Sequence, residues 1–351
     1  MGFFYILFII LYKNKINIIK NEVKNHRIKS LLIINRKNEI GDAVLSIKPI
    51  KYLSKIFDKI YIFSEKNKWI YLNELNSCKN ISLIDSNSKE LYTEKFDLVL
   101  DLISDWQLLS KIKAKYKVGL NRGLFSFLNY DAFYPYNMTE SKLQYTNLWI
   151  DVCKHLFGIE IKIDDLPPKD FKKKKMNQIF IFVGNKPNRN LPYEKWKELI
   201  LLSAKKAKTI VADDPDQRIM NQLKKDKEII QNKDIYLVIG TRELKYLAKI
   251  ANDSKLFIAL DGGAEHYLER YTNSVVFYTC GFPYNWKPYS LNPYRKISTN
   301  SSHVLEETIT SAGLRKYVFY NIPKRKPCYD LVCDYKEFKK LKFNLLSDLL
   351  C

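Results

Sequence analysis

The chain has few of the residues that build disulfide frameworks or metal centres. Its 351 residues include six cysteines and four histidines, and no two cysteines form a Cys-x-x-Cys pair. The histidines do not gather beside the cysteines, which stand at positions 78, 153, 280, 328, 333 and 351. Isolated thiols in a chain of this length favour a reducing compartment over a disulfide framework. We therefore expect no metal site and no cofactor.

Signatures of nucleic-acid binding are missing too. The sequence shows neither zinc-finger spacing nor a basic–aromatic RNA-binding motif, so we expect no nucleic-acid partner. Internal repeats and low-complexity tracts are also absent. Hydrophobic residues make up 46% of the chain, which excludes a disordered protein. A length of 351 residues suits two domains better than one.

Acidic residues are the minority charge. There are 38 Asp and Glu residues against 59 Lys and Arg residues, a net charge of +21. Such an excess indicates an anionic partner, either nucleic acid, a membrane surface or a phosphorylated substrate. A Lys-rich, AT-biased genome would give the same excess, and the charge alone does not separate the two explanations.

The N-terminal segment lacks the features of a membrane span or a signal peptide. The apolar run Phe3–Tyr12 is too short to cross a bilayer, no Lys or Arg precedes it, and no Ala-x-Ala-like site follows. Six basic residues follow between Lys13 and Lys29. A poor signal peptide, a first helix packed on the protein and a membrane-surface anchor all remain open. We favour the anchor, with apolar residues in the lipid and lysines at anionic head groups.

Short apolar runs alternate with helical patterns along most of the chain. Unbroken runs of this kind are typical of strands covered on both faces, and their alternation with helices indicates parallel α/β sheets. Two sets of five therefore predict two Rossmann-like domains. The expected strands are 31–34, 60–63, 81–84, 98–102 and 116–118, and then 179–183, 209–212, 235–239, 256–260 and 275–278.

A proline pair and a lysine run mark the boundary between these sets. Pro167 and Pro168 precede the basic run Lys172–Lys175, a composition typical of a linker. The predicted segments are an apolar and basic N-terminus at 1–27, a first domain at 28–165, a second domain at 176–325, and a C-terminal tail at 326–351 with a closing helix over 335–350.

The first candidate site follows the first expected strand. A polar loop after 31–34 ends in Gly41-Asp42, and a helical pattern begins there. A carboxylate at this position caps backbone N–H groups or takes a proton from a substrate. Both interpretations of Asp42 remain open on these residues alone.

Three loops of the second domain supply further candidates. Asp261-Gly262-Gly263 leads from a strand into a helix with His266 on its first turn, which suits a diphosphate, although a tight turn with a surface histidine fits as well. An earlier loop carries Gly184, Lys186 and Arg189, with glycine and cations suited to phosphate or simply an exposed basic loop. The aromatic loop 281–289 includes Trp286 and suits either a sugar platform or loop packing. Asp214-Pro215-Asp216 has metal-ligand spacing, and we interpret it as a turn.

Together these segments resemble the glycosyltransferase family 9 heptosyltransferases, the ADP-heptose:lipopolysaccharide enzymes of Gram-negative bacteria. The resemblance runs from about Ile28 to Tyr294 and rests on ordered motifs. The motifs are Ile40-Gly41-Asp42-Ala43-Val44-Leu45; Phe96 to Leu102 leading to Val118-Gly119-Leu120-Asn121-Arg122; Gly184, Arg189, Pro192 and Trp196; Asp261 to His266; and Gly281, Pro283, Trp286, Pro288 and Tyr289.

The resemblance implies a GT-B fold, with two Rossmann-like domains whose parallel sheets face each other across a cleft. It implies inverting, metal-independent transfer of a heptose from ADP-heptose to a lipopolysaccharide or lipooligosaccharide core sugar, on the cytoplasmic, inner face of the inner membrane. Asp42 would be the general base. The implied donor-binding residues are Gly184, Lys186, Arg189, Asp261, Gly262, Gly263 and His266, with Arg122 and Trp286 as candidates for the acceptor or cleft.

The chain departs from the family pattern at three positions. Gly262 replaces a threonine, Arg189 replaces a lysine, and Glu265 adds a negative charge near the expected diphosphate. Gly262 and Glu265 motivate one alternative, a related transferase that uses another nucleotide sugar for capsule or surface polysaccharide. A second alternative is a non-catalytic sugar-nucleotide-binding homologue that keeps the fold and the basic surface.

Overall fold

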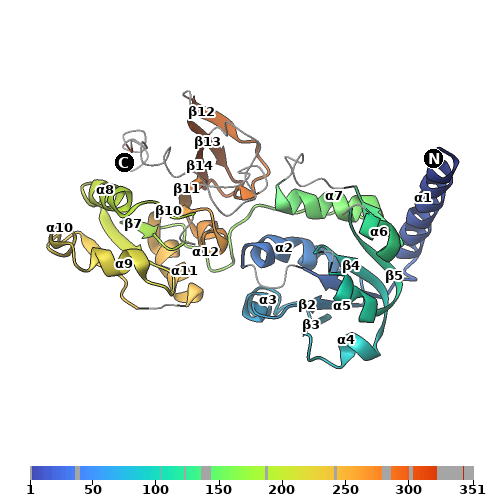
Figure 1. Ribbon diagram of the computed structural model, residues 1–351. Coiled ribbons are helices and arrows are strands. Elements are labelled where there is room, and N and C mark those ends of the chain that lie inside the picture. Colours follow the sequence, from blue (N-terminus) through green and yellow to red (C-terminus); the bar gives the residue numbers. More distant parts are fainter. Residues whose placement is uncertain are drawn as a thin grey trace. The chain divides into compact units, whose positions relative to one another are not determined.

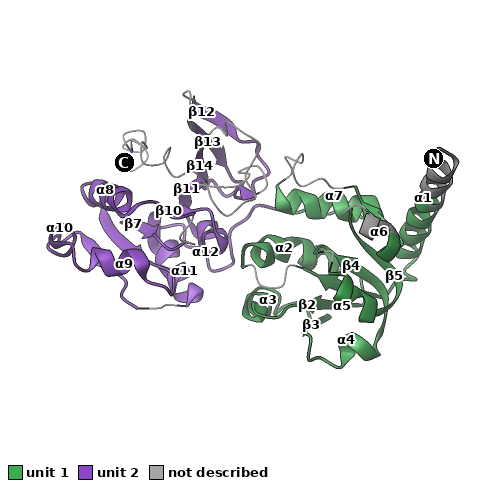
Figure 2. Ribbon diagram, viewed as in Figure 1, with its two compact units in different colours: residues 1–163 green, residues 164–351 purple. Residues whose placement is uncertain are grey.

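The chain separates into two compact units in the computed structural model. The units comprise residues 1–163 and 164–351 (Figure 2). The structure describes residues 2–35, 40–103, 105–121, 124–135, 144–185, 189–240, 243–278, 286–299, 303–321 and 343. The expected closing helix over 335–350 lies outside these residues apart from Phe343, which packs edge-on against Phe277 with ring centroids 5.9 Å apart.

The first unit alternates strands and helices (Figure 1). Its strands are β1 (Ser30–Ile34), β2 (Lys59–Phe63), β3 (Ile81–Ile84), β4 (Lys95–Asp101), β5 (Lys113–Leu120) and β6 (Ala132–Tyr134). Its helices are α1 (Gly2–Lys24), α2 (Ile40–Leu53), α3 (Lys68–Glu74), α4 (Glu90–Thr93), α5 (Trp106–Lys111), α6 (Leu124–Asn129) and α7 (Tyr145–Phe157). The strands form one sheet in the order β3-β2-β1-β4-β5-β6.

All pairs in this sheet are parallel, and β1 lies at its centre. The apolar run of β1 is buried because helices cover both faces of a doubly wound sheet. The strand order changes direction beside β1, where β2 lies on one side and β4 on the other. Ligands of open parallel sheets bind outside the carboxyl ends of the strands at such a point. The end of β1 and the start of α2 therefore occupy the expected place for a site.

The second half of α1 packs on this unit. Ile16, Ile19 and Val23 are buried at helical spacing, and the helix contacts α7 and β6. Tyr12 donates a hydrogen bond to the backbone oxygen of Phe133. This part of the segment is thus a first helix packed on the protein, one of the three alternatives that the sequence left open. Among the described residues, no helix is long and apolar enough to cross a membrane.

The second unit repeats the α/β alternation and adds an antiparallel extension (Figure 1). Its strands are β7 (Met176–Phe182), β8 (Lys208–Ala212), β9 (Ile235–Leu237), β10 (Ser254–Leu260), β11 (Asn273–Tyr278), β12 (Arg295–Thr299), β13 (His303–Ile309) and β14 (Arg315–Asn321). Its helices are α8 (Tyr193–Ala204), α9 (Arg218–Leu223), α10 (Lys227–Ile230), α11 (Leu244–Asp253), α12 (Gly263–Leu268) and the 3₁₀ turn η2 (Glu269–Tyr271).

The second sheet has the order β12-β13-β14-β11-β10-β7-β8-β9. The pairs from β14 to β9 are parallel, whereas β12, β13 and β14 pair antiparallel. The parallel part, from β9 through β7 to β14, repeats the strand order of the first unit. Its direction changes between β7 and β10, so the loops after these two strands occupy the second expected site.

The ten expected strands are all present as β1 to β5 and β7 to β11. Two parallel-dominated sheets in separate units confirm the predicted α/β class with two Rossmann-like domains. The sequence analysis missed β6 and the extension β12 to β14. Asp165 fixes the chain at the start of the second unit, where its carboxylate accepts hydrogen bonds from the backbone N–H groups of Leu291 (3.0 Å) and Ser311 (3.1 Å).

Candidate functional site

Asp42 lies on the first turn of α2, and its side chain is buried. Asn35, the residue after β1, contacts this turn through its side-chain amide. Its amide nitrogen lies 3.3 Å from the backbone oxygen of Asp42, 3.1 Å from the hydroxyl of Ser46 and 3.1 Å from the hydroxyl of Tyr71. Tyr145 of α7 donates to the amide oxygen of Asn35 at 2.9 Å. A network from four segments thus fixes the backbone that carries Asp42.

Burial and neighbouring groups both act on Tyr71, the tyrosine of this network. Burial raises the pKa of Tyr71, and the Asp42 carboxylate adds to that rise, while hydrogen bonds from Ser46 and Asn35 oppose it. Tyr71 therefore stays a neutral hydroxyl at neutral pH. A carboxyl group on a backbone held in this way can act as a general base toward a substrate that reaches it. Arg122, a candidate acceptor residue, lies outside the described residues.

The donor candidates meet where β7, β8 and β10 end. Asn185 donates from its amide to the backbone oxygen of Asp261 at 2.9 Å, which ties the loop after β7 to the loop after β10. Gly184 lies against the loop after β8, since a Cβ there would stand 2.4 Å from the backbone nitrogen of Asp214. Only glycine permits this approach. The structure therefore brings Gly184 and Asp261 to one edge of the sheet, whereas Lys186 lies outside the described residues.

Asp261 and His266 face each other across the Gly262-Gly263 turn. The distance from His266 Nε2 to Asp261 Oδ1 is 3.8 Å. Burial raises the pKa of Asp261 to about 7, against a lowering by the charge of Arg189. Burial lowers the pKa of His266 to about 4, so the imidazole is neutral at neutral pH. Of the two interpretations that the sequence left open, the surface histidine of a tight turn is wrong, because His266 is buried.

Glu265 points into the same buried volume. Its Oε2 lies 3.2 Å from His266 Nδ1. Burial, followed by the charges of Glu269 and Asp261, raises the pKa of Glu265 well above its ordinary value. Sequence analysis expected Glu265 to add a negative charge near the diphosphate. Its burial beside other acids instead favours the neutral, protonated form, against smaller opposing effects of the Lys316 charge and of the Gly262 backbone.

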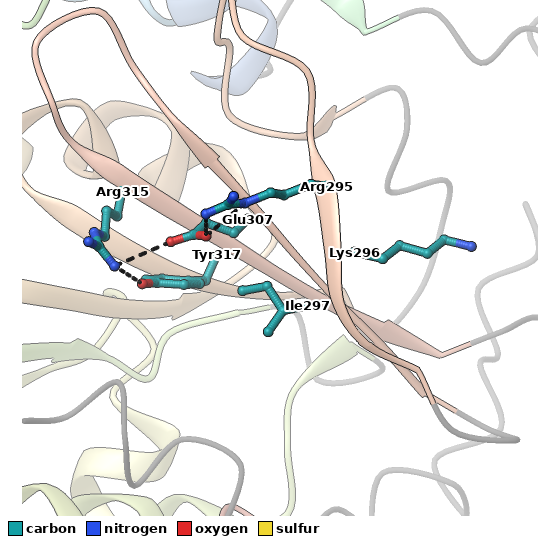
Figure 3. Close-up of a pocket in the computed structure, with 6 residues that line it drawn as sticks. All are labelled: Arg295, Lys296, Ile297, Glu307, Arg315 and Tyr317. Carbon is teal, nitrogen blue, oxygen red and sulfur yellow. Dashed lines mark hydrogen bonds and ion pairs between the residues drawn. The ribbon is translucent and has the colours of Figure 1, made fainter.

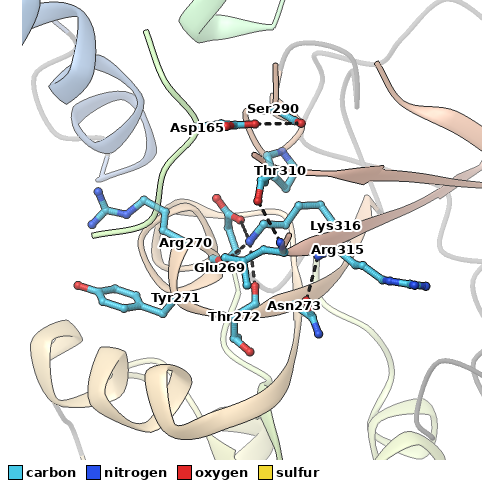
Figure 4. A network of polar contacts seen from close by, with 12 residues as sticks. Asp165, Glu269, Arg270, Tyr271, Thr272, Asn273, Ser290, Thr310, Arg315 and Lys316 are labelled. Atoms are coloured by element: carbon cyan, nitrogen blue, oxygen red, sulfur yellow. Dashed lines mark hydrogen bonds and ion pairs between the residues drawn. The ribbon is translucent and has the colours of Figure 1, made fainter. Parts of the chain in front are cut away.

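A buried ion pair joins β14 to η2, the turn that follows α12 (Figure 4). The ammonium of Lys316 on β14 lies 2.6 Å from Oε2 of Glu269 in η2. It also donates to the backbone oxygens of Glu269 and of Thr272, the latter at 2.9 Å. Neither partner was singled out from the sequence, because their positions are 47 residues apart and neither falls in a motif.

The same three side chains, Asp261, Glu265 and His266, have atoms of the kind that bind metal ions. Ligand atoms of Asp261, Glu265 and His266 lie within 4.8 Å of one another, a spacing that a divalent ion would fit. The direct contact between His266 and Glu265 fits a hydrogen-bonded pair equally well. Asp214 and Asp216 form a turn, as interpreted from the sequence: the Asp214 carboxylate accepts from the backbone N–H of Asp216 at 3.0 Å.

Trp286, in the segment after β11, lies beside His266. Its ring centroid lies 6.3 Å from that of His266, and its backbone oxygen accepts a hydrogen bond from Tyr278 at 2.7 Å. The rest of the aromatic loop, 281–285, lies outside the described residues. A flat side chain at this place can cover a base or a sugar.

A separate basic groove lies on the antiparallel extension (Figure 3). It has a volume of about 430 Å³ and is lined by Arg295, Lys296, Ile297, Glu307, Arg315 and Tyr317. The Glu307 carboxylate pairs with Arg295 at 3.0 Å and with Arg315 at 3.6 Å. The shared carboxylate takes up part of the arginine charge, so the groove carries only a modest positive excess.

Comparisons with known proteins agree with this architecture. No family model matches the chain, and no curated protein matches it by sequence. Among solved structures, E. coli heptosyltransferase WaaC with ADP superposes with a TM-score of 0.55 at 13% identity, over 73% of this chain and 89% of that chain. E. coli ADP-heptose lps heptosyltransferase II gives 0.56 at 13%, over 77% and 91%. A glycosyl transferase family 9 protein from Veillonella parvula gives 0.55 at 16%, over 76% and 88%.

These likenesses show the fold. The chain has the two-domain fold of the heptosyltransferases and of a family 9 glycosyltransferase, which confirms the resemblance inferred from its motifs.

Proposed function

We propose that this protein is a glycosyltransferase that moves a heptose from ADP-heptose to a lipopolysaccharide or lipooligosaccharide core sugar, with inversion and without a metal. The main support is the agreement between the fold and the places of Asp42 and of the Asp261–His266 turn, each after a strand beside its sheet's switch point. The solved structures of similar fold include a heptosyltransferase with ADP-2-deoxy-2-fluoro heptose.

The proposed reaction is a single displacement at the anomeric carbon. The acceptor hydroxyl forms the new C–O bond as the bond to the diphosphate breaks, and Asp42 takes the hydroxyl proton. The electron pair leaves with the diphosphate as ADP. Gly262 and Gly263 would present backbone N–H groups, and His266 and Arg189 would stabilise the developing negative charge. Asp261, Gly184 and Lys186 complete the proposed donor site, with Arg122 and Trp286 near the acceptor or cleft.

The two domains would bind different substrates, and the protein would act at a membrane surface. Residues 28–165 would bind the acceptor and residues 176–325 the nucleotide sugar. The protein would work in the cytoplasm on the anionic inner face of the inner membrane, with residues 3–12 as its surface contact. Residues 326–351 would form a C-terminal tail with a helix.

One alternative is favoured by particular residues. Gly262 and Glu265 depart from the family motif at the donor turn, which supports transfer of another nucleotide-activated sugar for capsule or surface polysaccharide. Thermal stabilisation of the full chain by a panel of nucleotide sugars separates the donors. A non-catalytic homologue would be stabilised by a donor without transferring its sugar.

The sharpest test of the mechanism is Asp42→Asn. The amide keeps the shape of the side chain but cannot take the proton, so turnover should fall by about 10²–10⁴-fold while donor binding is retained. Asp58→Asn, in the turn after α2, is the matched control and should transfer normally. Near-normal transfer by Asp42→Asn would show that Asp42 only supports the helix terminus. Transfer that disappears with EDTA and returns with Mg²⁺ or Mn²⁺ would refute the metal-independent step.

A further inference from the structure

We propose that Glu265 is a positioning residue that, in its protonated form, donates a hydrogen bond to Nδ1 of His266 and so fixes the imidazole as the Nε2–H tautomer. The inference rests on the proposed function, in which His266 donates to the diphosphate. It assigns a role to an acidic residue of the turn that departs from the family motif and whose charge would oppose an anionic ligand.

The side chains of Glu265 and His266 lie close together in a buried place. Glu265 Oε2 and His266 Nδ1 lie 3.2 Å apart, and the residues are 1% and 4% exposed. Neither carboxyl oxygen of Glu265 nor Nδ1 of His266 has a hydrogen-bond partner of good geometry among the described residues, and the two side chains approach each other closely enough to pair after a small rotation. Buried polar atoms are rarely left unsatisfied, and one proton between them satisfies both. The other ring nitrogen, Nε2, faces Asp261.

The charges around the pair decide which side chain carries the proton. Lys316 pairs with Glu269 and with two backbone oxygens. Its charge and the backbone N–H of Gly262 lower the pKa of Glu265, but burial and the charges of Glu269 and Asp261 raise it by more. Asp261 lies on the far side, with Arg189 as its nearest cation. The remaining titratable neighbours are Tyr278 and Tyr294, whose pKa values burial raises well above the ordinary value. A carboxyl group in such a place holds its proton, and a buried imidazole stays neutral.

A neutral imidazole has a single N–H group. If Nδ1 accepts from Glu265, the hydrogen must be on Nε2, where it can be donated to Asp261 or to a phosphate oxygen. An ionised Glu265 would draw the hydrogen to Nδ1 and leave a lone pair on Nε2. That lone pair would repel the phosphate, so a carboxylic acid at position 265 is compatible with an anionic ligand.

Two substitutions of Glu265 separate this role from a structural one. Glu265→Gln keeps the shape and supplies an amide N–H to Nδ1, whereas Glu265→Met keeps the volume and supplies no donor. Nitrogen-15 NMR of the full chain reports the tautomer, and loss of the signal in His266→Gln assigns it. We expect the Nε2–H tautomer in the parent chain and in Glu265→Gln, and a mixture in Glu265→Met. An Nδ1–H tautomer in the parent chain would overturn the inference.

Activity supplies a second, separate readout. With a donor that is turned over, Glu265→Gln should transfer within roughly threefold of the parent, and Glu265→Met should lose about 10²-fold in kcat, the scale of one lost charge-stabilising donor. The exposed Glu228→Met is the matched control and should behave as the parent. Unchanged kcat and tautomer in Glu265→Met would refute the positioning role.

Two further results are decisive. One equivalent of a divalent ion in the purified chain, lost in Glu265→Gln, would show that the cluster is a metal site and overturn the assignment. If no nucleotide sugar is turned over, the proposed function fails, but the tautomer in the parent chain and in Glu265→Gln still tests Glu265.

Discussion

Replacing Lys316 with methionine should destabilise the second unit by about 3–5 kcal/mol, the cost of removing one partner from a buried ion pair. Methionine keeps the length and apolar stem of lysine, so it leaves little cavity. It removes the ammonium that lies 2.6 Å from Glu269 and that also meets two backbone oxygens (Figure 4). The Lys316 side chain is 2% exposed, so water cannot replace the lost contacts.

The expected loss converts to a large thermal shift. For a unit of this size, residues 164–351, each kcal/mol corresponds to about 2–4 °C in Tm, so the shift should be ~6–20 °C. Differential scanning calorimetry of the full chain measures it on the transition of the second unit. Lys296→Met removes an exposed lysine from the neighbouring strand β12 and should change stability by no more than ~0.5 kcal/mol.

The double variant Glu269→Gln/Lys316→Met tests the cause. Without the carboxylate, no uncompensated charge stays buried, so the double variant should regain much of the stability that Lys316→Met loses. A shift for Lys316→Met no larger than that for Lys296→Met would refute the reasoning. A double variant less stable than the single would show that packing, not charge, dominates here.

Three other substitutions test separate parts of the structure. Gly184→Ala should destabilise the chain and weaken binding of ADP, measured by calorimetry, because its Cβ would overlap the backbone at Asp214; intact stability and binding would contradict the close approach. Ile19→Ala should cost about 2–5 kcal/mol in chemical denaturation, since this residue is fully buried, while Ile18→Ala, 46% exposed, should cost almost nothing; equal effects would mean that α1 does not pack. Asp261 has a raised pKa, about 7 against 3.8, so the contribution of Asp261 to the free energy of unfolding should fall as pH rises from 4 to 7. His266 has a lowered pKa, so the contribution of His266 should rise between pH 4 and 6.5. Asp261→Asn should therefore leave stability rising more steeply over this range, and an unchanged slope would contradict the raised pKa.

The parallel strands could be predicted from the sequence because each is a short apolar run closed by polar residues. β6 and β12 to β14 could not. β6 has only three residues. In the extension, β12 is exposed over 295–297, whereas β13 and β14 bury charged residues such as Glu306, Glu307 and Lys316 among their apolar ones. β13 and β14 are held by antiparallel hydrogen bonding to each other, and no local sequence pattern indicates this pairing.

Some residues of the candidate site could likewise be predicted from the sequence, and others could not. Asp42, Gly184 and Asp261 follow predicted strands, so a pattern of strand, glycine and polar residue finds them. Tyr145 and Lys316 could not be found, because they join the sites from 110 and 47 positions away through single side chains. Such contacts depend on the tertiary fold and leave no periodic signal in the sequence.

The edges of the two sheets bear on how the protein stays unaggregated. An exposed edge strand offers unpaired backbone groups to another chain unless it is short or charged. β3, β6 and β9 have only four, three and three residues, which gives a second strand little length to pair with. The longer edge, β12, carries exposed Arg295 and Lys296, whose repulsion opposes the approach of an identical strand. Protection against edge-to-edge association is thus built into each sheet locally, apart from the high net charge of the whole chain.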